Sequence, residues 1–154
     1  MSLIPPSDVD QILNIRILRL ASKLTLIFQR ETLRPAGIKV QQWRIMVSLA
    51  QFDELHLRSL ARHSSQDPAH TSRVVKSMIA AGWVNSRPDD HDQRRIQYTL
   101  TDDGLKIVKD IWPRAQQFAS DIAALFEADA FDQFKSMLDI AGASCDARLS
   151  NSGS

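Results

Sequence analysis

The sequence lacks the features that mark several protein classes. Its single cysteine, Cys145, cannot form an intrachain disulfide or a cysteine-rich zinc site. No stretch reaches the ~18 consecutive apolar residues of a membrane helix, and the first residues lack the basic-then-apolar order of a secretory signal. There is no Gly-rich phosphate loop, nucleophile elbow or His/acid pair at catalytic spacing. We therefore expect a cytoplasmic protein that is not an enzyme, does not bind membranes and needs no cofactor.

Histidine is also scarce, and its spacing does not suggest a metal site. The four histidines are His56, His63, His70 and His91. No two of them form the His-x3-His pair that places two ligands on one helix face. We therefore expect no metal site.

Apolar residues are plentiful, and charge is unevenly distributed. Hydrophobic residues make up 44% of the 154 residues, enough for a packed core. The net charge is only +1, but residues 58–101 carry 7 Lys/Arg against 4 Asp/Glu, while residues 102–154 carry 5 against 9. A polyanionic partner would therefore bind the middle third of the chain.

Hydrophobic periodicity predicts a mainly α-helical chain with one small β-hairpin. The expected helices cover residues 7–33, 39–51, 57–63, 67–81, 101–126 and 129–143, and the expected strands cover 83–87 and 96–100. The first helix carries more apolar residues than one face can hold, among them Ile15, Leu18 and Leu26. This excess suggests that a second chain packs against it.

The helix at 67–81 has the clearest boundaries. Asp67 is an expected N-cap, Pro68 occupies the first helical position, and Gly82 follows the end. Its predicted inner face holds apolar residues and one threonine: Thr71, Val74, Val75, Met78 and Ile79. Its predicted outer face is polar and basic: His70, Arg73, Lys76 and Ser77.

The order helix–turn–helix followed by a hairpin is typical of a winged helix. In that fold one helix enters the DNA major groove and the hairpin, or wing, lies alongside. A polar outer face and a helix N-terminus that favours phosphates suit the segment from Asp67 to Ala81 for this role.

Three stretches give the chain a resemblance to the MarR family of winged-helix transcription regulators, over about Ile12 to Ile122. They are Leu57-Arg58-Ser59-Leu60-Ala61, then Thr71-Ser72-Arg73-Val74-Val75 leading to Ala80-Ala81-Gly82-Trp83-Val84, and Asp92-Gln93-Arg94-Arg95 leading to Leu100-Thr101 and Gly104. The resemblance implies a winged helix-turn-helix between helical dimerisation arms. It also implies a homodimeric repressor that binds palindromic double-stranded DNA and is released from it by a small aromatic or lipophilic acid.

The resemblance assigns roles to four residues. Ser72 and Arg73 match DNA-contacting positions of the reading helix, Arg94 matches the wing arginine of the minor groove, and Asp92 matches the acid that braces it. From helix geometry and the preceding turn we add Ser65, Gln66, His70 and Lys76 to the expected DNA-binding residues. In this scheme His70 and Ser72 reach base edges, while Arg73 and Lys76 contact phosphates.

Plainer interpretations remain open for these residues. Arg73 and Arg94 could be solvated surface charges, and Asp92 could satisfy only the backbone donors of its turn. Arg58 and Arg62 are expected as ordinary helix-surface residues, with phosphate contact as the alternative. The wing loop carries as many acids as arginines, which weakens the electrostatic case for the wing and leaves it to Arg94.

The expected organisation has four parts. Residues 1–36 and 102–149 form the dimerisation helices, 37–101 the DNA-binding lobe, and 150–154 a disordered tail. Arg16, Trp43 and Arg44 are candidates for the ligand pocket. Trp43 could instead belong to the core, and Arg16 could pair with an acid across the dimer. The alternative function is a winged-helix module for protein contacts without an effector, which would call for an apolar or acidic outer face on the reading helix.

Overall fold

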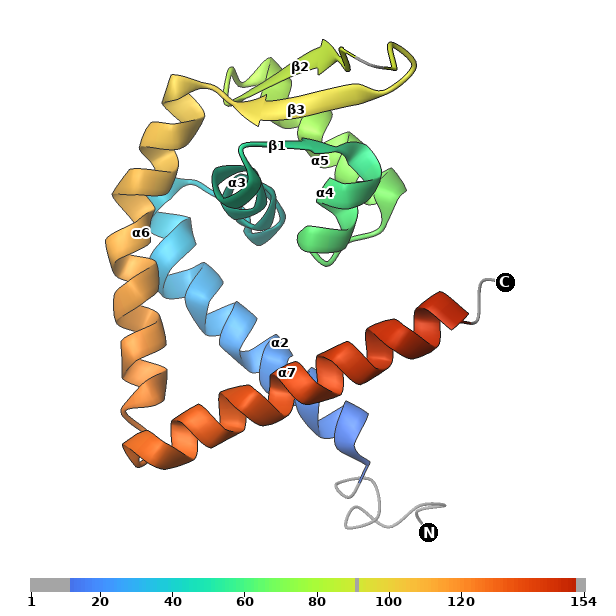
Figure 1. The fold of residues 1–154 in the computed structure, drawn as a ribbon. Coiled ribbons are helices and arrows are strands. Elements are labelled where there is room, and N and C mark those ends of the chain that lie inside the picture. The colour runs from blue at the N-terminus through green and yellow to red at the C-terminus, as the bar shows by residue number, and fades with distance from the viewer. Residues whose placement is uncertain (1–11, 91, 152–154) are drawn as a thin grey trace, which may run out of the picture. The chain divides into compact units, whose positions relative to one another are not determined.

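The computed structural model in Figure 1 describes residues 12–90 and 92–151. The chain forms two compact units, with the boundary between Ala115 and Gln116 inside a long helix. The expected start of the first helix at Ser7 lies outside the described residues, as do His91 and residues 152–154. Among the residues that are described, no helix is both long and apolar enough to span a membrane.

The first unit holds the helices and strands that were expected for a winged helix. Its elements are α2 (Leu13–Phe28), the π-helical turn η1 (Gln29–Leu33), the 3-10 turn η2 (Arg34–Ala36), α3 (Val40–Phe52), β1 (Glu54–His56), α4 (Leu57–His63), α5 (Pro68–Ala80), β2 (Val84–Pro88), β3 (Ile96–Leu100) and the part of α6 (Asp102–Ala123) up to Ala115. The predicted fold class, mainly α with a small hairpin wing, is confirmed. The helix predicted to run unbroken to Leu33 instead leaves α-helical geometry after Phe28.

The strands form one antiparallel sheet in the order β1-β3-β2 (Figure 1). The hairpin of β2 and β3 pairs Val84 with Leu100, and β1 adds a third strand in which Leu55 pairs with Tyr98. Strand β1 was not predicted from the sequence because three residues are too few to show an alternating pattern. We call residues 84–100, which form the hairpin and its loop, the wing.

The predicted N-cap and the predicted terminal glycine of α5 are both confirmed. The Asp67 carboxylate accepts a hydrogen bond from the His70 backbone N–H at 2.8 Å. Gly82 has a φ of +78°, the left-handed conformation that glycine adopts without strain. The predicted inner face needs one correction: Ile79 is 36% exposed, because it lies at the edge of the face that is centred on the buried Thr71, Val75 and Met78.

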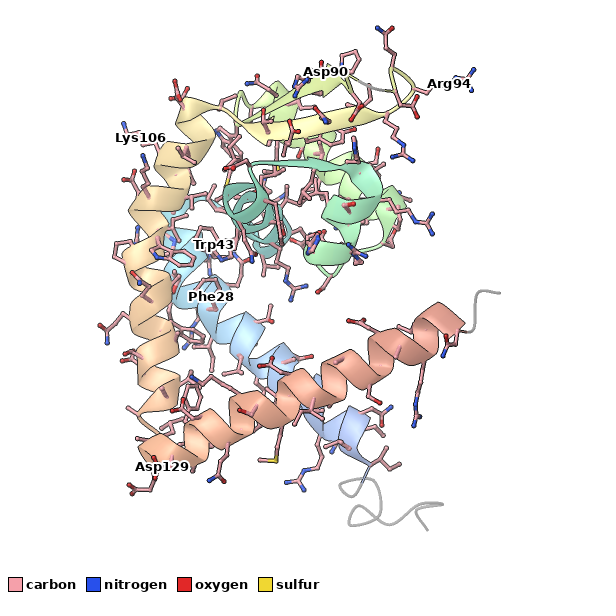
Figure 2. The ribbon with its side chains drawn as sticks, viewed as in Figure 1. Phe28, Trp43, Asp90, Arg94, Lys106 and Asp129 are labelled. Atoms are coloured by element: carbon pink, nitrogen blue, oxygen red, sulfur yellow. The ribbon has the colours of Figure 1, made fainter. Side chains whose placement is uncertain are left out.

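The core of the first unit lies between α3, α4, α5, the sheet and the first half of α6. Its buried hydrophobic members are Leu33, Ile38, Trp43, Ile45, Met46, Leu49, Leu60, Val75, Met78, Val84, Val108 and Ile111. Trp43 is 7% exposed and its ring lies 6.2 Å from that of Phe28 (Figure 2), so Trp43 is a core residue. This packing fixes α5 from behind and leaves its opposite face free.

The second unit contains the end of α6 and α7 (Ala128–Asn151). Phe126 anchors the turn between them, because its ring lies 5.6 Å from that of Phe131 and 5.8 Å from that of Phe134. The helix predicted to end at Ala143 runs to Asn151 and includes the first residues of the predicted disordered tail. Several apolar side chains of α7 are exposed in the single chain: Met137, Leu138, Ile140 and Leu149.

Candidate nucleic-acid interface

The face of α5 that points away from the core carries exposed positive charge. Arg73 and Lys76 are exposed, and His70 and Ser72 are half-buried on the same helix. Neither Arg73 nor Lys76 forms an ion pair with any residue that the structure describes. Two cations without an acidic partner on an exposed helix face are suited to a polyanion.

Asp67 is the acidic N-cap of this helix, and the helix N-terminus stabilises its charge. The His70 backbone N–H hydrogen bond lowers the pKa of Asp67 below its ordinary value of 3.8. At neutral pH the carboxylate is therefore ionised and directed at the helix N-terminus. It satisfies a backbone donor that would otherwise have no partner within the helix.

The two candidate residues in the turn before α5 differ in environment. Ser65 is exposed, and its backbone adopts a positive φ of 55°. The Gln66 side-chain amide instead donates to the carbonyl oxygen of Gln41 on α3 at 3.2 Å, and the buried amide oxygen of Gln66 has no hydrogen-bond partner among the described residues. In this structure Gln66 joins the turn to α3, while Ser65 faces outward.

Buried Asp89 organises the loop of the wing. It is 8% exposed, and its carboxylate accepts hydrogen bonds from the Asp92 backbone N–H at 2.9 Å and the Gln97 side chain at 2.8 Å. The Nε2 atom of His56 on β1 lies 3.3 Å from the same carboxylate. From the sequence Asp89 counts only as a loop charge, because nothing local indicates that it is buried.

The other acids of the wing loop have arginine partners. Asp90 pairs with Arg87 at 3.0 Å, and Asp92 pairs with Arg95 at 3.5 Å. Arg94 is the arginine of the loop that has no ion pair among the described residues. Its side chain extends from the end of the wing, away from the rest of the unit (Figure 2). The loop is neutral in sum, yet it presents one uncompensated guanidinium at its end.

The expected brace between Asp92 and the Arg94 side chain is absent from the described part of the wing. The Asp92 carboxylate accepts a hydrogen bond from the Arg94 backbone N–H at 3.1 Å, and its side-chain partner is Arg95. The acid therefore fixes the backbone of the turn, as in the plainer of the two interpretations. The Arg94 guanidinium remains available to a ligand.

A groove between α2 and α3 contains one of the three ligand-pocket candidates. It is an open, mostly apolar depression of about 450 Å³, with lining residues Leu18, Ala21, Ser22, Thr25, Leu26, Gln29, Val40 and Arg44. Arg44 is thus the one of the three candidates that lines this groove. Trp43 belongs to the core instead, and Arg16 lies on α2 outside the lining of this α2–α3 groove.

The sequence has recognisable relatives. Residues 38–96 match the MarR family. Over 107 residues the chain is 29% identical to the HTH-type transcriptional regulator FarR of Neisseria gonorrhoeae, a match that covers 70% of this chain and 73% of FarR. Over residues 38–96 the chain is thus similar to the MarR family, whose named members are transcriptional regulators rather than enzymes.

Solved structures of transcriptional regulators share the fold of this chain. A mutant MarR from E. coli complexed with operator DNA aligns with a TM-score of 0.76 at 20% identity, covering 86% of this chain and 96% of that one. NadR in complex with 4-hydroxyphenylacetate aligns with a TM-score of 0.74 at 24% identity, covering 92% and 95%. At these identities the likeness concerns the winged-helix fold.

Proposed function

We propose that the protein is a MarR-family regulator, a homodimer that binds a palindromic operator as a repressor and is released by a small aromatic or lipophilic acid. The DNA-binding part rests on one observation: Arg73 and Lys76 lie on the exposed face of α5 and form no ion pair among the described residues. Arg94 at the end of the wing adds a third such cation. A protein-binding module would instead present an apolar or acidic face there.

The docking follows from these positions. The N-terminal half of α5 enters the major groove, where His70 and Ser72 reach base edges and Arg73 and Lys76 contact phosphates. Ser65 lies at the exposed turn beside them. Arg94 enters the minor groove, whose negative potential attracts a guanidinium. Gln66 and Asp92 contribute by holding the turn and the wing in place.

Exposed apolar residues support the homodimer. On α2 and at its N-cap they are Ile12, Leu13, Ile17, Leu18, Leu20, Leu26 and Ile27, and further ones lie on α7. A monomer would leave this much apolar surface in water, which soluble monomers rarely do. We assign residues 1–36 and 102–149 to dimerisation and 37–101 to DNA binding. A two-fold dimer would present two copies of α5 to the half-sites of a palindrome.

The α2–α3 groove is the proposed effector site. Its apolar lining suits an aromatic ring, and Arg44 suits a carboxylate through charge-assisted hydrogen bonds. A ligand that binds here releases DNA only if its affinity differs between the DNA-bound and free conformations. The aromatic acid in the NadR complex is of the chemical class that we propose.

The test of DNA binding begins with selection of bound sequences from a random duplex pool. A palindromic motif is expected. Arg73→Ala should then weaken binding to the selected duplex by about 1–3 kcal/mol. Lys109→Ala, which removes one exposed cation from α6, is the control for net charge. Recovery of no motif, or equal effects of the two substitutions, would contradict the proposal.

The dimer and the effector have separate tests. Leu20→Asp should shift the sedimentation coefficient from that of a dimer to that of a monomer, whereas Lys23→Asp on the same helix should not.

Calorimetric titration with 4-hydroxyphenylacetate and related acids should show binding that is lost in Arg44→Ala and retained in Arg16→Ala. A reporter gene under the selected operator should become more active when the regulator is deleted, since repression is proposed.

A further inference from the structure

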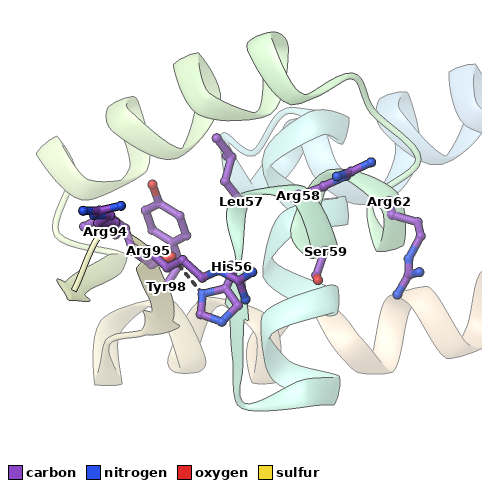
Figure 3. A pocket seen from close by; sticks show the side chains of 9 residues that line it. His56, Leu57, Arg58, Ser59, Arg62, Arg94, Arg95 and Tyr98 are labelled. Atoms are coloured by element: carbon purple, nitrogen blue, oxygen red, sulfur yellow. Dashed lines mark hydrogen bonds between the residues drawn. The ribbon is translucent and has the colours of Figure 1, made fainter. Parts of the chain in front are cut away.

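His56 connects strand β1 to both ends of the wing loop. Its Nε2 atom lies 3.3 Å from a carboxylate oxygen of Asp89, which directly follows β2. Its Nδ1 atom lies 3.3 Å from the carbonyl oxygen of Ile96, the first residue of β3. The imidazole ring thus spans the base of the loop that carries Arg94, and it lines an open pocket together with Arg95 (Figure 3).

Both partners of the His56 ring accept hydrogen bonds, and neither of them donates one. A carboxylate and a backbone carbonyl oxygen are acceptors only. A neutral imidazole has one N–H, so it donates to one partner and turns a nitrogen lone pair toward the other. An imidazolium has two N–H groups and donates to both partners. The two contacts of His56 therefore match the protonated ring.

The state of His56 affects the whole loop, because Asp89 is also the centre of the loop's hydrogen bonds. The Asp89 carboxylate accepts from the Asp92 backbone N–H at 2.9 Å and from the Gln97 side chain at 2.8 Å. The Asp89 backbone N–H donates to the Arg95 carbonyl oxygen at 2.9 Å. Asp89 is buried, whereas the His56 side chain is 33% exposed. The ring can therefore exchange a proton with solvent while its partner holds the loop from inside.

The other ionisable groups around His56 do not replace Asp89 as its partner. Glu54, on the same strand, pairs with Arg87 of β2 at 2.8 Å. Burial raises the pKa of Tyr98, which also lines the pocket, above its ordinary value of 10.0, so this residue is neutral at neutral pH. The remaining charged residues of the pocket are arginines of α4 and the wing: Arg58, Arg62, Arg94 and Arg95. They oppose a charge on the ring, but they are exposed and screened by solvent, whereas Asp89 contacts the ring directly.

We infer that His56 is a positioning residue for the wing and that the proton on its ring decides how firmly the wing loop is held. With the ring protonated, β1 donates to both ends of the loop, and Arg94 extends from a fixed base. With the ring neutral, one of the two contacts is lost. An imidazole ordinarily changes charge near pH 6.5, so the loop should tighten as pH falls through that region and loosen as it rises. The consequence for DNA rests on the proposed role of Arg94, whereas the effect on the loop does not.

Hydrogen exchange in the protein without DNA tests the effect on the loop. Exchange at residues 92–97 is measured at about pH 6 and about pH 8, on either side of the ordinary histidine range, and is divided by the intrinsic rate at each pH. The resulting protection should be roughly threefold to fivefold greater at the lower pH, which is the size expected for a partly exposed ion pair. Equal protection at the two pH values would overturn the inference.

Three substitutions identify the group responsible. His56→Gln does not titrate, so its protection should be independent of pH. His56→Lys keeps a charge at both pH values, and at the higher pH it should protect the loop better than His56→Gln does. His63→Gln is the matched control, because the His63 ring on α4 lies 4.2 Å from that of Phe52 and it should keep the wild-type pH dependence. A pH dependence that persists in His56→Gln, or that disappears in His63→Gln, would overturn the assignment to His56.

Affinity for the selected duplex tests the consequence for DNA binding. Because His70 is a second histidine at the proposed interface, His70→Gln is compared with the His56→Gln/His70→Gln double variant. Between about pH 8 and about pH 6, affinity should rise roughly threefold more in the single variant, since an ordered loop loses less freedom when Arg94 inserts. Equal pH dependence of the two would overturn the link to DNA affinity.

The two measurements separate failure of this inference from failure of the proposed function. If the loop responds to pH through His56 and no duplex is bound, the proposed function is wrong and the positioning role of His56 stands. If the wild type binds the selected duplex and protection of the loop is independent of pH, the positioning role is wrong and the proposed function stands.

Discussion

Gly104 at the start of α6 lies so close to the carbonyl oxygen of Trp83 that a Cβ atom at position 104 would overlap it. Thr101 reinforces the same junction: its hydroxyl donates to the Gly82 carbonyl oxygen at 2.7 Å and accepts from the Gly104 N–H at 3.0 Å. The residues that follow α5 and the start of α6 are thus held together, and the atoms that face Gly104 belong to the backbone of Trp83, which has little freedom to move.

Gly104→Ala should therefore destabilise the protein. Forcing a methyl group against backbone costs about 1–3 kcal/mol, which corresponds to a fall in Tm of roughly 2–4 °C per kcal/mol in a chain of this size. Gly142→Ala on α7 is the matched control, because a Cβ atom at position 142 would have no neighbour within 4 Å and alanine favours a helix. Calorimetry should show a lower Tm for Gly104→Ala and no fall in Tm for Gly142→Ala. A wild-type Tm in Gly104→Ala would refute the close packing.

Replacing Asp67 by asparagine should alter the dependence of stability on pH. The pKa of Asp67 is lowered in the folded state, so the ionised carboxylate stabilises the fold above the ordinary value of 3.8 and this contribution disappears as pH falls through the lowered folded pKa. Asparagine caps a helix about equally well without titrating. The Tm advantage of wild type over Asp67→Asn, measured by circular dichroism, should be larger at about pH 6 than at about pH 2. A pH-independent difference would show that the charge is irrelevant.

Asp89→Ala should loosen the wing. The substitution leaves the Asp92 N–H and the Gln97 amide without their acceptor, and a buried donor without a partner costs about 1–3 kcal/mol. Hydrogen exchange at residues 92–97 should become faster. Asp90→Ala is the adjacent control, since the Asp90 side chain is exposed and its loss should change exchange little. Equal protection in Asp89→Ala and wild type would mean that the carboxylate does not hold the loop.

Arg94→Ala should weaken operator binding most on duplexes with A·T-rich flanks. A narrow A·T-rich minor groove concentrates negative potential, so it gains most from an inserted guanidinium. Fluorescence titrations with duplexes that differ only in their flanks would measure this. Arg87→Ala removes a wing arginine that is already paired with Glu54 and Asp90, and should show no preference for flank. The same loss on G·C-rich flanks would argue against minor-groove insertion by Arg94.

Much of the reading helix could be predicted, because its signals are local. The cap, the proline and the terminal glycine of α5 act within a few residues of one another, so the sequence carries their geometry directly. The same holds for the Thr101 cap of α6 and the two strands of the hairpin. The exposed side of α5 follows from helical periodicity once its inner face is known.

Other parts of the site depend on contacts between distant residues. The strand β1 exists because Glu54, Leu55 and His56 pair with residues 97–99 of β3, about forty positions later. The orientation of Gln66 depends on the Gln41 carbonyl oxygen, and the burial of Asp89 depends on Gln97 and His56. No local pattern encodes these partners.

The order and boundaries of most helices, the hairpin and the basic face of α5 could thus be read from the order of residues, since hydrophobic period and helix-end chemistry act over a few positions. Which charges are free was settled by the folded chain. Folding placed Asp89 inside the wing, paired Asp90 and Asp92 with arginines, and left Arg94 at the end of the wing without an ion pair among the described residues. Net charge adds along a chain regardless of position, whereas the field that DNA meets depends on which opposite charges lie within a few ångströms of each other.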